Sequence, residues 1–323
     1  MRAARVHTLD GPRAMQVEEV DDATRGDDQV LIEVHRAGVT FPDALQTRGL
    51  YQYKPELPFI PGSEVAGTVV EAPAGSGFSP GDRVAAFPML GGFAELVAAP
   101  VHMTFPLPDS VSMSAGAALP MNYLTVEFAL GRRGRLSVGE TVLVHGAAGG
   151  VGTAAIQLAK ALGAKVIAVT STEEKGEVAL GAGADHAIRV DGFKDAAKEL
   201  TEGRGVDIVV DPVGGDRFTD SLRSLAPEGR MLVIGFTAGE IPTVKVNRLL
   251  LNNIDVVGVG WGAFVLPRPG EVGRQWQRLL PHLNAGHLDP PIGHEYALDD
   301  AGEAVASLEE RTAAGKVLLA VRD

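Results

Sequence analysis

The chain has 323 residues, 45% of them hydrophobic and 22% charged, a composition that suits a soluble globular protein with two domains. It has no cysteine, which excludes disulfides, thiolate zinc ligands and a cysteine nucleophile. The formal net charge of −12 disfavours a nucleic-acid partner. Because no apolar run reaches the roughly 18 residues of a membrane helix and the N-terminus lacks the apolar core of a signal peptide, we expect a cytoplasmic protein without a membrane partner.

Residues 1–120 are predicted to form short strands that glycine and proline interrupt. Val30, Ile32 and Val34 alternate with polar neighbours, which is the pattern of a strand with one buried face. Pro-Gly and Gly-Gly pairs between the apolar runs indicate turns. This region is therefore predicted to be a β-rich, partly open barrel. Its predicted strands are Ala3–Thr8, Gln29–Ala37, Val65–Glu71, Asp82–Phe87 and Phe93–Ala98.

From about Ala115 the apolar residues change to helical spacing, and the chain then alternates strands and helices up to about Gly260. Short apolar runs between helix-like segments are typical of a parallel, doubly wound sheet of the Rossmann type. An α/β fold with a six-stranded parallel sheet is therefore predicted. Its strands are Thr141–His145, Val166–Thr170, His186–Val190, Val206–Asp211, Met231–Phe236 and Ile254–Val259.

Near the C-terminus a helix is predicted at Glu271–Asn284, and a second helix follows that Asp299 or Asp300 is expected to cap. Lys316–Val321 is predicted to be a closing strand. We expect this strand to pair with the N-terminal sheet, because a short strand after the last helix needs an existing sheet. The predicted domains are therefore residues 1–121 together with 262–323, and residues 122–261.

The segment TVLVHGAAGGVG, Thr141–Gly152, joins an apolar strand to a cluster of glycines at the start of a predicted helix. At such a junction the first helical N–H groups are unpaired and the helix dipole is positive, so the backbone binds phosphate. The motif reads AxGGxG, with alanine at the first position of the usual GxGxxG. We expect it to bind a dinucleotide rather than to form a plain tight turn. The expected contacts are Ala147, Gly149, Gly150, Val151 and Gly152.

The strand Val166–Thr170 is followed by Ser171 and Thr172, with no carboxylate where NAD enzymes hold the ribose 2′-hydroxyl. Small hydroxyls and the cation of Lys175 suit the 2′-phosphate of NADPH. Two glutamates that follow Thr172 count against this interpretation. The alternative is that Ser171 or Thr172 caps the next helix and Lys175 is a solvated charge. We favour NADPH over NADH.

Ligands of doubly wound sheets collect at the carboxyl ends of the strands. The backbone of Gly235, Gly258 and Gly260 is therefore expected to contact the nicotinamide, and Phe236 is expected to cover its ring. An ordinary turn is the alternative at each of these positions. Asp211, which ends another predicted strand, is expected to stabilise the turn that follows it.

A β domain, then AAGGVGTAAIQLAKALGAKVIA, VDIVVDPVGG and a closing GKVLL follow one another along the chain. In this order, and over essentially its whole length, the sequence resembles the zinc-free quinone oxidoreductases of the medium-chain dehydrogenase/reductase superfamily. The resemblance implies a GroES-like β-barrel catalytic domain, a Rossmann domain that binds a nicotinamide cofactor, and a cleft between them. It also implies a homodimer that pairs through Ile254–Gly260. Supporting motifs are RAGVTFPDALQTRGLY (Arg36–Tyr51), LPFIPGSEVAGTV (Leu57–Val69), GDRVAAF (Gly81–Phe87), GGFAELV (Gly91–Val97) and NYLTVEFAL (Asn122–Leu130).

Zinc alcohol dehydrogenases of the same superfamily carry a cysteine near the position of Thr40 and a histidine in a GHE motif. In this chain the second motif reads Gly62-Ser63-Glu64, and cysteine is absent. His282 and His287 are five residues apart, which is a poor match to one helical face. We therefore predict no metal site.

The resemblance also assigns roles to single residues. Tyr51 matches a tyrosine near the cleft and is expected to donate a hydrogen bond or proton to the substrate oxygen, with Tyr53 as its rival. The alternative for Tyr51 is a loop aromatic whose hydroxyl meets solvent. Thr40 stands where many relatives have asparagine, and it is expected to orient substrate or nicotinamide, whereas Asp43 and Glu64 are expected to be structural. The residues expected along the cofactor are Thr125, with Asn122 and Tyr123 beside it, and Lys316.

These features predict NADPH-dependent hydride transfer to a small-molecule quinone or α,β-unsaturated carbonyl, without a metal. One alternative is an enoyl-thioester reductase, which needs positive charge to bind a phosphorylated coenzyme A. The candidates for that charge are Arg48, Lys54, Arg248 and Arg268. Another alternative is a non-catalytic protein that binds NADPH.

Overall fold

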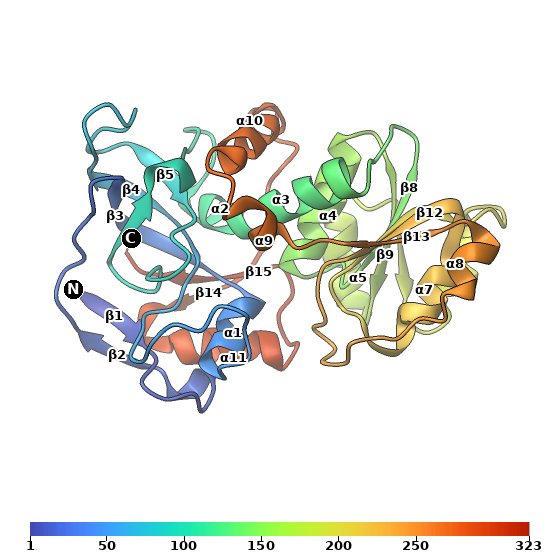
Figure 1. Ribbon diagram of the computed structural model, residues 1–323, viewed down its shortest axis with the longest axis horizontal. Coiled ribbons are helices and arrows are strands. Elements are labelled where there is room, and N and C mark those ends of the chain that lie inside the picture. Colours follow the sequence, from blue (N-terminus) through green and yellow to red (C-terminus); the bar gives the residue numbers. More distant parts are fainter. Residues whose placement is uncertain (323) are drawn as a thin grey trace. The chain divides into compact units, whose positions relative to one another are not determined.

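The structure is a computed structural model that describes residues 1–322. The chain divides into two compact units. The first contains Met1–Met121, Pro269–Gln277 and the chain from Ile292 onward, and the second contains Asn122–Arg268 and Arg278–Pro291. The domains predicted from the sequence differ from these units in the placement of residues 262–268 and 278–291. The predicted α/β class, with a different sheet in each unit, is confirmed (Figure 1).

The first unit is built on a seven-stranded sheet of order β14-β15-β3-β4-β5-β7, in which β6 also pairs with β3. Val30, Ile32 and Val34 of β3 are fully buried in its core, as their alternation predicted. The predicted return of the C-terminal strand is confirmed, since β15 pairs antiparallel with β3. A separate pair joins β1 to β2. The strands are β1 (Arg2–Arg5), β2 (Gln16–Glu19), β3 (Gln29–Val39), β4 (Glu64–Glu71), β5 (Arg83–Ala86), β6 (Leu96–Pro100), β7 (Thr104–Pro106), β14 (Ile292–Ala297) and β15 (Lys316–Ala320).

The helices of the first unit include α1 (Phe41–Thr47), α2 (Met113–Ala118) and α11 (Ala301–Glu309). Asp300 occupies the predicted N-cap position of α11, but its side chain makes no capping hydrogen bond. A short 3-10 helix leads directly into α11, so the backbone itself starts the helix. The carboxylate of Asp299 binds the guanidinium of Arg2 instead.

The second unit contains the predicted six-stranded sheet, with every neighbouring pair parallel and the order β10-β9-β8-β11-β12-β13. Because the chain leaves β8 in one direction along the sheet and returns to β11 on its other side, the strand order reverses between β8 and β11. Strand β12 begins earlier than predicted, because its pairing with β11 starts at Leu225. The strands are β8 (Thr141–His145), β9 (Lys165–Thr170), β10 (His186–Arg189), β11 (Val206–Asp211), β12 (Leu225–Val233) and β13 (Asp255–Gly258).

Helices cross between consecutive strands and cover the two faces of this sheet (Figure 1). Helices α4 and α5 pack together beside β8, β9 and β10, and α6 and α7 pack together on the strands' other face, as right-handed crossovers require. Helix α3 continues as a π-helix over Phe128–Arg133. The helices within the second unit are α4 (Gly150–Ala161), α5 (Glu173–Gly181), α6 (Phe193–Leu200), α7 (Phe218–Ser224), α8 (Asn247–Asn252) and α9 (Trp261–Val265). Two further helices, α3 (Pro120–Glu127) and α10 (Glu271–Asn284), begin in the first unit and end in the second.

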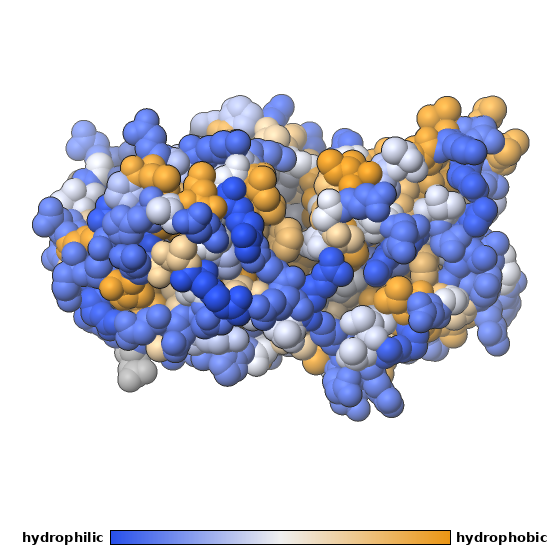
Figure 2. All heavy atoms as spheres, turned by 90° about the horizontal axis from the view of Figure 1, so that it is seen from below, coloured by the Kyte–Doolittle hydropathy of each residue, from blue (hydrophilic) through white to orange (hydrophobic). Residues whose placement is uncertain are grey.

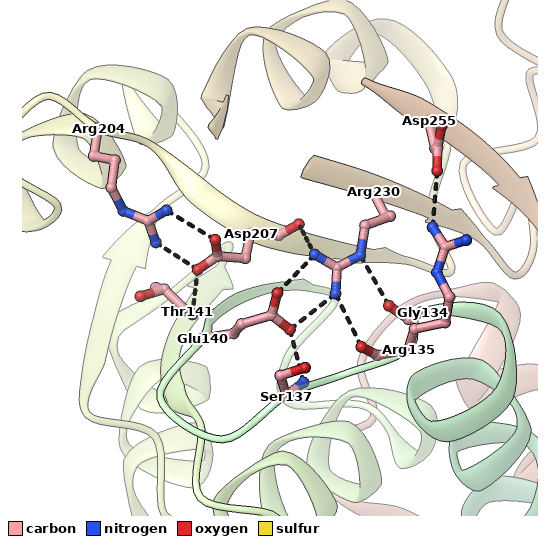
Figure 3. Close-up of polar contacts among 9 residues, drawn as sticks. All are labelled: Gly134, Arg135, Ser137, Glu140, Thr141, Arg204, Asp207, Arg230 and Asp255. Carbon is pink, nitrogen blue, oxygen red and sulfur yellow. Dashed lines mark hydrogen bonds and ion pairs between the residues drawn. The ribbon is translucent and has the colours of Figure 1, made fainter. Parts of the chain in front are cut away.

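Arg230 ties together the segments near the amino end of this sheet (Figure 3). Its side chain is 10% exposed, and the guanidinium binds both carboxylate oxygens of Glu140 at 2.8 Å. It also donates to the carbonyl oxygens of Gly134 at 2.9 Å, Arg135 at 3.3 Å and Asp207 at 3.4 Å. The Asp207 carboxylate accepts from the backbone N–H that begins β8, at 2.8 Å. Hydrogen bonds to one buried cation therefore join the loop before β8 to β11 and β12.

Candidate functional site

The glycine turn lies between the end of β8 and the start of α4. Gly149 is the N-cap of α4, and the first turn of a helix presents N–H groups that have no partner within the helix. A Cβ on Gly152 would lie 2.3 Å from the carbonyl oxygen of Gly146, and a Cβ on Gly150 would lie 2.6 Å from Nδ2 of Asn122. The backbone therefore excludes a side chain at Gly152, whereas at Gly150 the Asn122 side chain would have to move. The result is a bare backbone surface at the positive end of a helix, which suits a phosphate group.

The residues predicted to bind a 2′-phosphate lie together at the end of β9. The hydroxyl of Thr172 accepts from the backbone N–H of Lys175 at 3.2 Å and caps α5. The capping role that was the alternative for Thr172 is therefore present, and the same hydroxyl is also hydrogen-bonded to the carboxylate of Glu174. Thr170 donates to the carbonyl oxygen of Thr172 at 3.2 Å, which fixes the path of the chain around Ser171.

The structure adds Arg189, which the sequence interpretation missed. Arg189 ends β10 and pairs in register with Thr170, the last residue of β9. Its guanidinium donates to the carbonyl oxygen of Ser171. The sequence did contain a signal for Arg189, namely a basic residue at the end of the predicted strand that follows β9. It was missed because the pairing of β10 with β9 becomes explicit only in the sheet order.

The remaining predicted cofactor residues of the second unit lie at carboxyl ends of strands. Gly235 and Phe236 follow β12, and the ring of Phe236 is 36% exposed. Gly258 ends β13, and its carbonyl oxygen accepts from Arg133 at 2.9 Å. Gly260 is the N-cap of α9.

Three neighbouring residues of α3 were expected along the cofactor. Asn122 lies against the glycine turn, and Thr125 is one helical turn further on and 8% exposed. Tyr123 instead points into the unit, where its hydroxyl donates to Oε1 of Gln157 at 2.6 Å. Gln157 also binds the backbone of Asp289 through both atoms of its amide. The expectation for Tyr123 is therefore wrong, because its hydroxyl is part of a buried network.

In the first unit, Thr40 and Asp43 form a buried polar pair at the start of α1. The Asp43 carboxylate accepts from the backbone N–H of Thr40 at 2.7 Å, from its hydroxyl at 2.6 Å and from the N–H of Gly62 at 3.2 Å. Burial raises the pKa of Asp43 to about 6, and the bonds from Thr40 oppose that rise. Asp43 therefore ties the loop together, as expected. Because its only proton is given to Asp43, the Thr40 hydroxyl offers a ligand lone pairs alone.

Lys316 and Glu64 form a second buried pair in the first unit. The Lys316 ammonium binds Oε1 of Glu64, and the two side chains are 4% and 0% exposed. The other oxygen of Glu64 accepts from the N–H of Met121 at 2.7 Å. Glu64 thus joins β4 and β15 to the start of α3. The ammonium that was expected to face the cofactor is committed to this ion pair.

Tyr51 is half-buried in the same unit. Burial raises the pKa of its hydroxyl, and the negative charge of Asp43 raises it further. The hydroxyl therefore keeps its proton at neutral pH and remains able to donate it. Its rival Tyr53 is 48% exposed.

Two of the arginines considered for coenzyme A binding have other partners. Arg48 forms two hydrogen bonds with the carboxylate of Glu309, at 2.7 and 2.8 Å. Arg268 donates to the carbonyl oxygen of Phe264 at 2.6 Å and lies 4.4 Å from the centre of its ring. Within residues 1–322 no group of three or more histidine or acidic side chains is placed to hold a metal ion. No helix in the same range is both long and apolar enough to cross a membrane.

Known protein families match most of the chain. A model described as the alcohol dehydrogenase GroES-like domain matches residues 26–109, and one described as zinc-binding dehydrogenase matches residues 150–283. Quinone oxidoreductase-like protein 2 of Bos taurus is 37% identical over 314 residues, which cover 96% of this chain and 90% of that protein. The quinone oxidoreductase of Homo sapiens is 33% identical over 328 residues, which cover 99% and 97%.

Solved structures share the fold over the same length. A probable oxidoreductase from Mycobacterium abscessus has a TM-score of 0.91 at 43% identity, covering 99% of each chain. The quinone oxidoreductase of Escherichia coli, solved in complex with NADPH, has a TM-score of 0.90 at 30% identity and covers 99% of this chain and 100% of that one. Together with the glycine turn and the two units described above, this similarity shows that the chain belongs to the zinc-free quinone oxidoreductases of the medium-chain dehydrogenase/reductase superfamily.

Proposed function

We propose that this protein uses NADPH to reduce a quinone or an α,β-unsaturated carbonyl without a metal. The observation that carries the proposal is the bare glycine turn at the N-terminus of α4, where the backbone leaves no room for a side chain at Gly152. The similar Escherichia coli protein was solved with NADPH. When bound, the nicotinamide supplies the hydride.

The residues present fit a phosphorylated dinucleotide. The backbone N–H groups at the start of α4 suit a pyrophosphate, and the loop after β9 carries hydroxyls and no carboxylate at Ser171 and Thr172. Lys175 and Arg189 lie beside that loop and supply positive charge for a 2′-phosphate. These features favour NADPH over NADH.

The preference for NADPH has a direct test. Replacing Lys175 or Arg189 with Ala removes one cation and is expected to raise the Kd of NADPH roughly tenfold while leaving that of NADH unchanged. Isothermal titration with both cofactors measures this. Lys165→Ala, at the opposite end of β9, is the control. Equal losses for NADPH and NADH would contradict a 2′-phosphate role.

Tyr51 is proposed to donate a hydrogen bond or proton to the substrate oxygen on which negative charge develops. The hydroxyl is protonated at neutral pH, and its raised pKa favours donation of a hydrogen bond over release of the proton. Thr40 is proposed to accept a hydrogen bond from substrate or nicotinamide, because its proton is held by Asp43. Tyr51→Phe is expected to lower kcat by roughly 10²-fold with little change in cofactor affinity. Tyr53→Phe is the matched control, and an unchanged kcat in Tyr51→Phe would remove Tyr51 from the reaction.

The substrate class is tested by following NADPH oxidation with 1,2-quinones, 1,4-quinones, simple enones and crotonyl-CoA. Turnover is expected with quinones or enones. Turnover with crotonyl-CoA alone would favour an enoyl-thioester reductase. Binding of NADPH without oxidation by any acceptor would favour a non-catalytic protein.

A homodimer through β13 is also proposed. β13 is the last strand of the sheet order, and α8 beside it carries exposed Val246, Leu250 and Leu251, at 72%, 76% and 73%. Figure 2 shows apolar side chains gathered near its right edge, on the side where Figure 1 draws α8. Leu250→Glu with Leu251→Glu is expected to give a monomer in sedimentation experiments, whereas Val138→Glu, at another exposed apolar position, is not. An unchanged assembly in the double variant would contradict this interface.

A further inference from the structure

Asp211 lies at the point where the strand order of the second unit reverses. It ends β11, next to β8, and its side chain is 1% exposed. One carboxylate oxygen, Oδ1, accepts from the N–H groups of Val213 at 2.8 Å and Gly214 at 3.0 Å. The carboxylate therefore sets the conformation of the turn that follows β11, as the sequence predicted.

That turn supports the glycine turn on one side. Gly146, which follows β8, has a positive φ of 57°, and a Cβ added to it would lie 3.1 Å from Cγ2 of Val213. A shift of the Val213 side chain therefore alters the space next to Gly146. Gly146 in turn lies against Gly152 at the start of α4, whose added Cβ would meet the Gly146 carbonyl oxygen.

The same turn supports the loop after β12 on its other side. The N–H of Ala238 donates to the carbonyl oxygen of Val213 at 2.9 Å, and the N–H of Gly215 donates to that of Glu240 at 3.2 Å. Gly214 has a positive φ of 66°, and a Cβ there would lie 2.9 Å from Cδ1 of Phe236. The ring of Phe236 thus rests on the backbone that Asp211 holds.

The second oxygen of Asp211, Oδ2, is buried without a hydrogen-bond partner among the described residues. The same holds for Nδ1 of His145 and Nε of Arg217. Val144 of β8 and Val210 of β11 are paired in register, and His145 and Asp211 directly follow them. The two side chains therefore point to the same face of the sheet. The Ser221 hydroxyl donates its proton to the backbone carbonyl oxygen of Arg217, so it accepts a hydrogen bond from Nε2 of His145. The three atoms are therefore two acceptors and one donor.

We infer that Asp211 is a positioning residue for the dinucleotide site. Its carboxylate holds the Val213–Gly214 turn in the place where this turn supports both the glycine turn and Phe236. This inference rests on the proposed binding of NADPH. It concerns a residue that makes no contact with the cofactor itself. Loss of the carboxylate is expected to loosen the pyrophosphate end and the nicotinamide end of the site together.

The test compares Asp211→Leu with Asp211→Asn. Leucine keeps the branched shape at a larger volume but accepts no hydrogen bond, whereas asparagine keeps an oxygen for Val213 and Gly214. The Kd of NADPH is expected to rise roughly tenfold in the leucine variant and less than threefold in the asparagine variant. Hydrogen exchange without cofactor is expected to be faster at Val213 and Gly214 in the leucine variant alone.

A second ligand separates positioning from general loss of structure. 2′,5′-ADP lacks the nicotinamide half, so its affinity is expected to fall less than that of NADPH in Asp211→Leu. Equal affinity of the wild-type and leucine proteins for NADPH would overturn the inference, as would equal losses in the leucine and asparagine variants. Failure of the wild-type protein to bind NADPH would instead overturn the proposed function. If the leucine variant does not fold, Asp211→Ser, with a weaker acceptor, takes its place with the same expected order.

Discussion

The two ends of the parallel sheet differ in how their polar groups are satisfied. At the amino end, every N–H arm of Arg230 has an acceptor, and the neighbouring carboxylates of Glu140 and Asp207 are bound as well (Figure 3). At the carboxyl end, His145, Asp211 and Arg217 each keep a buried polar atom without a partner among residues 1–322.

This difference suggests that the two ends of one sheet serve different purposes, the amino end stability and the carboxyl end ligand binding. Removal of a fully paired buried cation destabilises the fold, because its partners are left buried and unpaired, and such a cation offers nothing to a ligand. Glycines without side chains, positive φ values and unpaired buried atoms are tolerated where a ligand needs close access to the backbone. The carboxyl end is therefore expected to govern affinity, and the amino end to govern stability.

The largest expected effect comes from Arg230→Met. It leaves the carboxylate of Glu140 and three carbonyl oxygens without their partner and is expected to lower the free energy of unfolding by about 3–5 kcal/mol. Urea denaturation measures this. The Kd of NADPH for the folded protein is expected to stay the same, because the cation lies at the amino end. A tenfold weaker Kd with unchanged stability would reverse the comparison.

The next effect concerns acid sensitivity at the carboxyl end. Burial lowers the pKa of His145 to about 3, and the charge of Arg217 adds to this. Between pH 6.5 and 3 the unfolded chain binds a proton that the folded chain does not, so stability falls as pH falls. Between pH 7 and 5 this amounts to about 2 kcal/mol. Urea denaturation at pH 7 and pH 5 measures this loss of unfolding free energy, and it is expected to be absent in His145→Gln. The same pH dependence in the variant as in the wild-type protein would contradict this role of His145.

Gly152→Ala and Gly149→Ala form a matched pair at the glycine turn. A Cβ on Gly152 would lie 2.3 Å from the Gly146 carbonyl oxygen, whereas one on Gly149 would lie 3.4 Å from the same atom. The Kd of NADPH is expected to rise at least tenfold, about 1.4 kcal/mol, in the Gly152 variant. It is expected to rise less than threefold in the Gly149 variant. Fluorescence titration measures both, and similar values would show that the close approach does not matter.

The smallest expected effect is that of Arg135→Ala. Its ion pair with Asp255 joins the same end of the sheet, at 2.9 Å, but the two side chains are 65% and 55% exposed. Solvent screens such a pair, so a loss below about 1 kcal/mol is expected in urea denaturation. A loss as large as that of Arg230→Met would mean that the number of ion pairs, rather than burial, stabilises this end.

The sequence predicted the sheets well because strand periodicity and glycine turns are local signals. The buried runs of β8 and β11, and the glycines after β8, needed no knowledge of distant residues. Arg230 and Arg189 were missed because their partners lie in other strands and become neighbours only through the sheet order. Tyr123 was placed on the cofactor side because its motif position says nothing about Gln157, the buried residue that binds its hydroxyl.

The central claim is that the carboxyl end of the parallel sheet binds the dinucleotide and the amino end does not. Hydrogen exchange of the wild-type protein with and without NADPH tests it most directly. We expect slower hydrogen exchange on NADPH binding in residues 146–152, 211–215 and 234–238. No change is expected in residues 134–141 around the Arg230 network. Protection at the amino end, or no protection at the glycine turn, would contradict it.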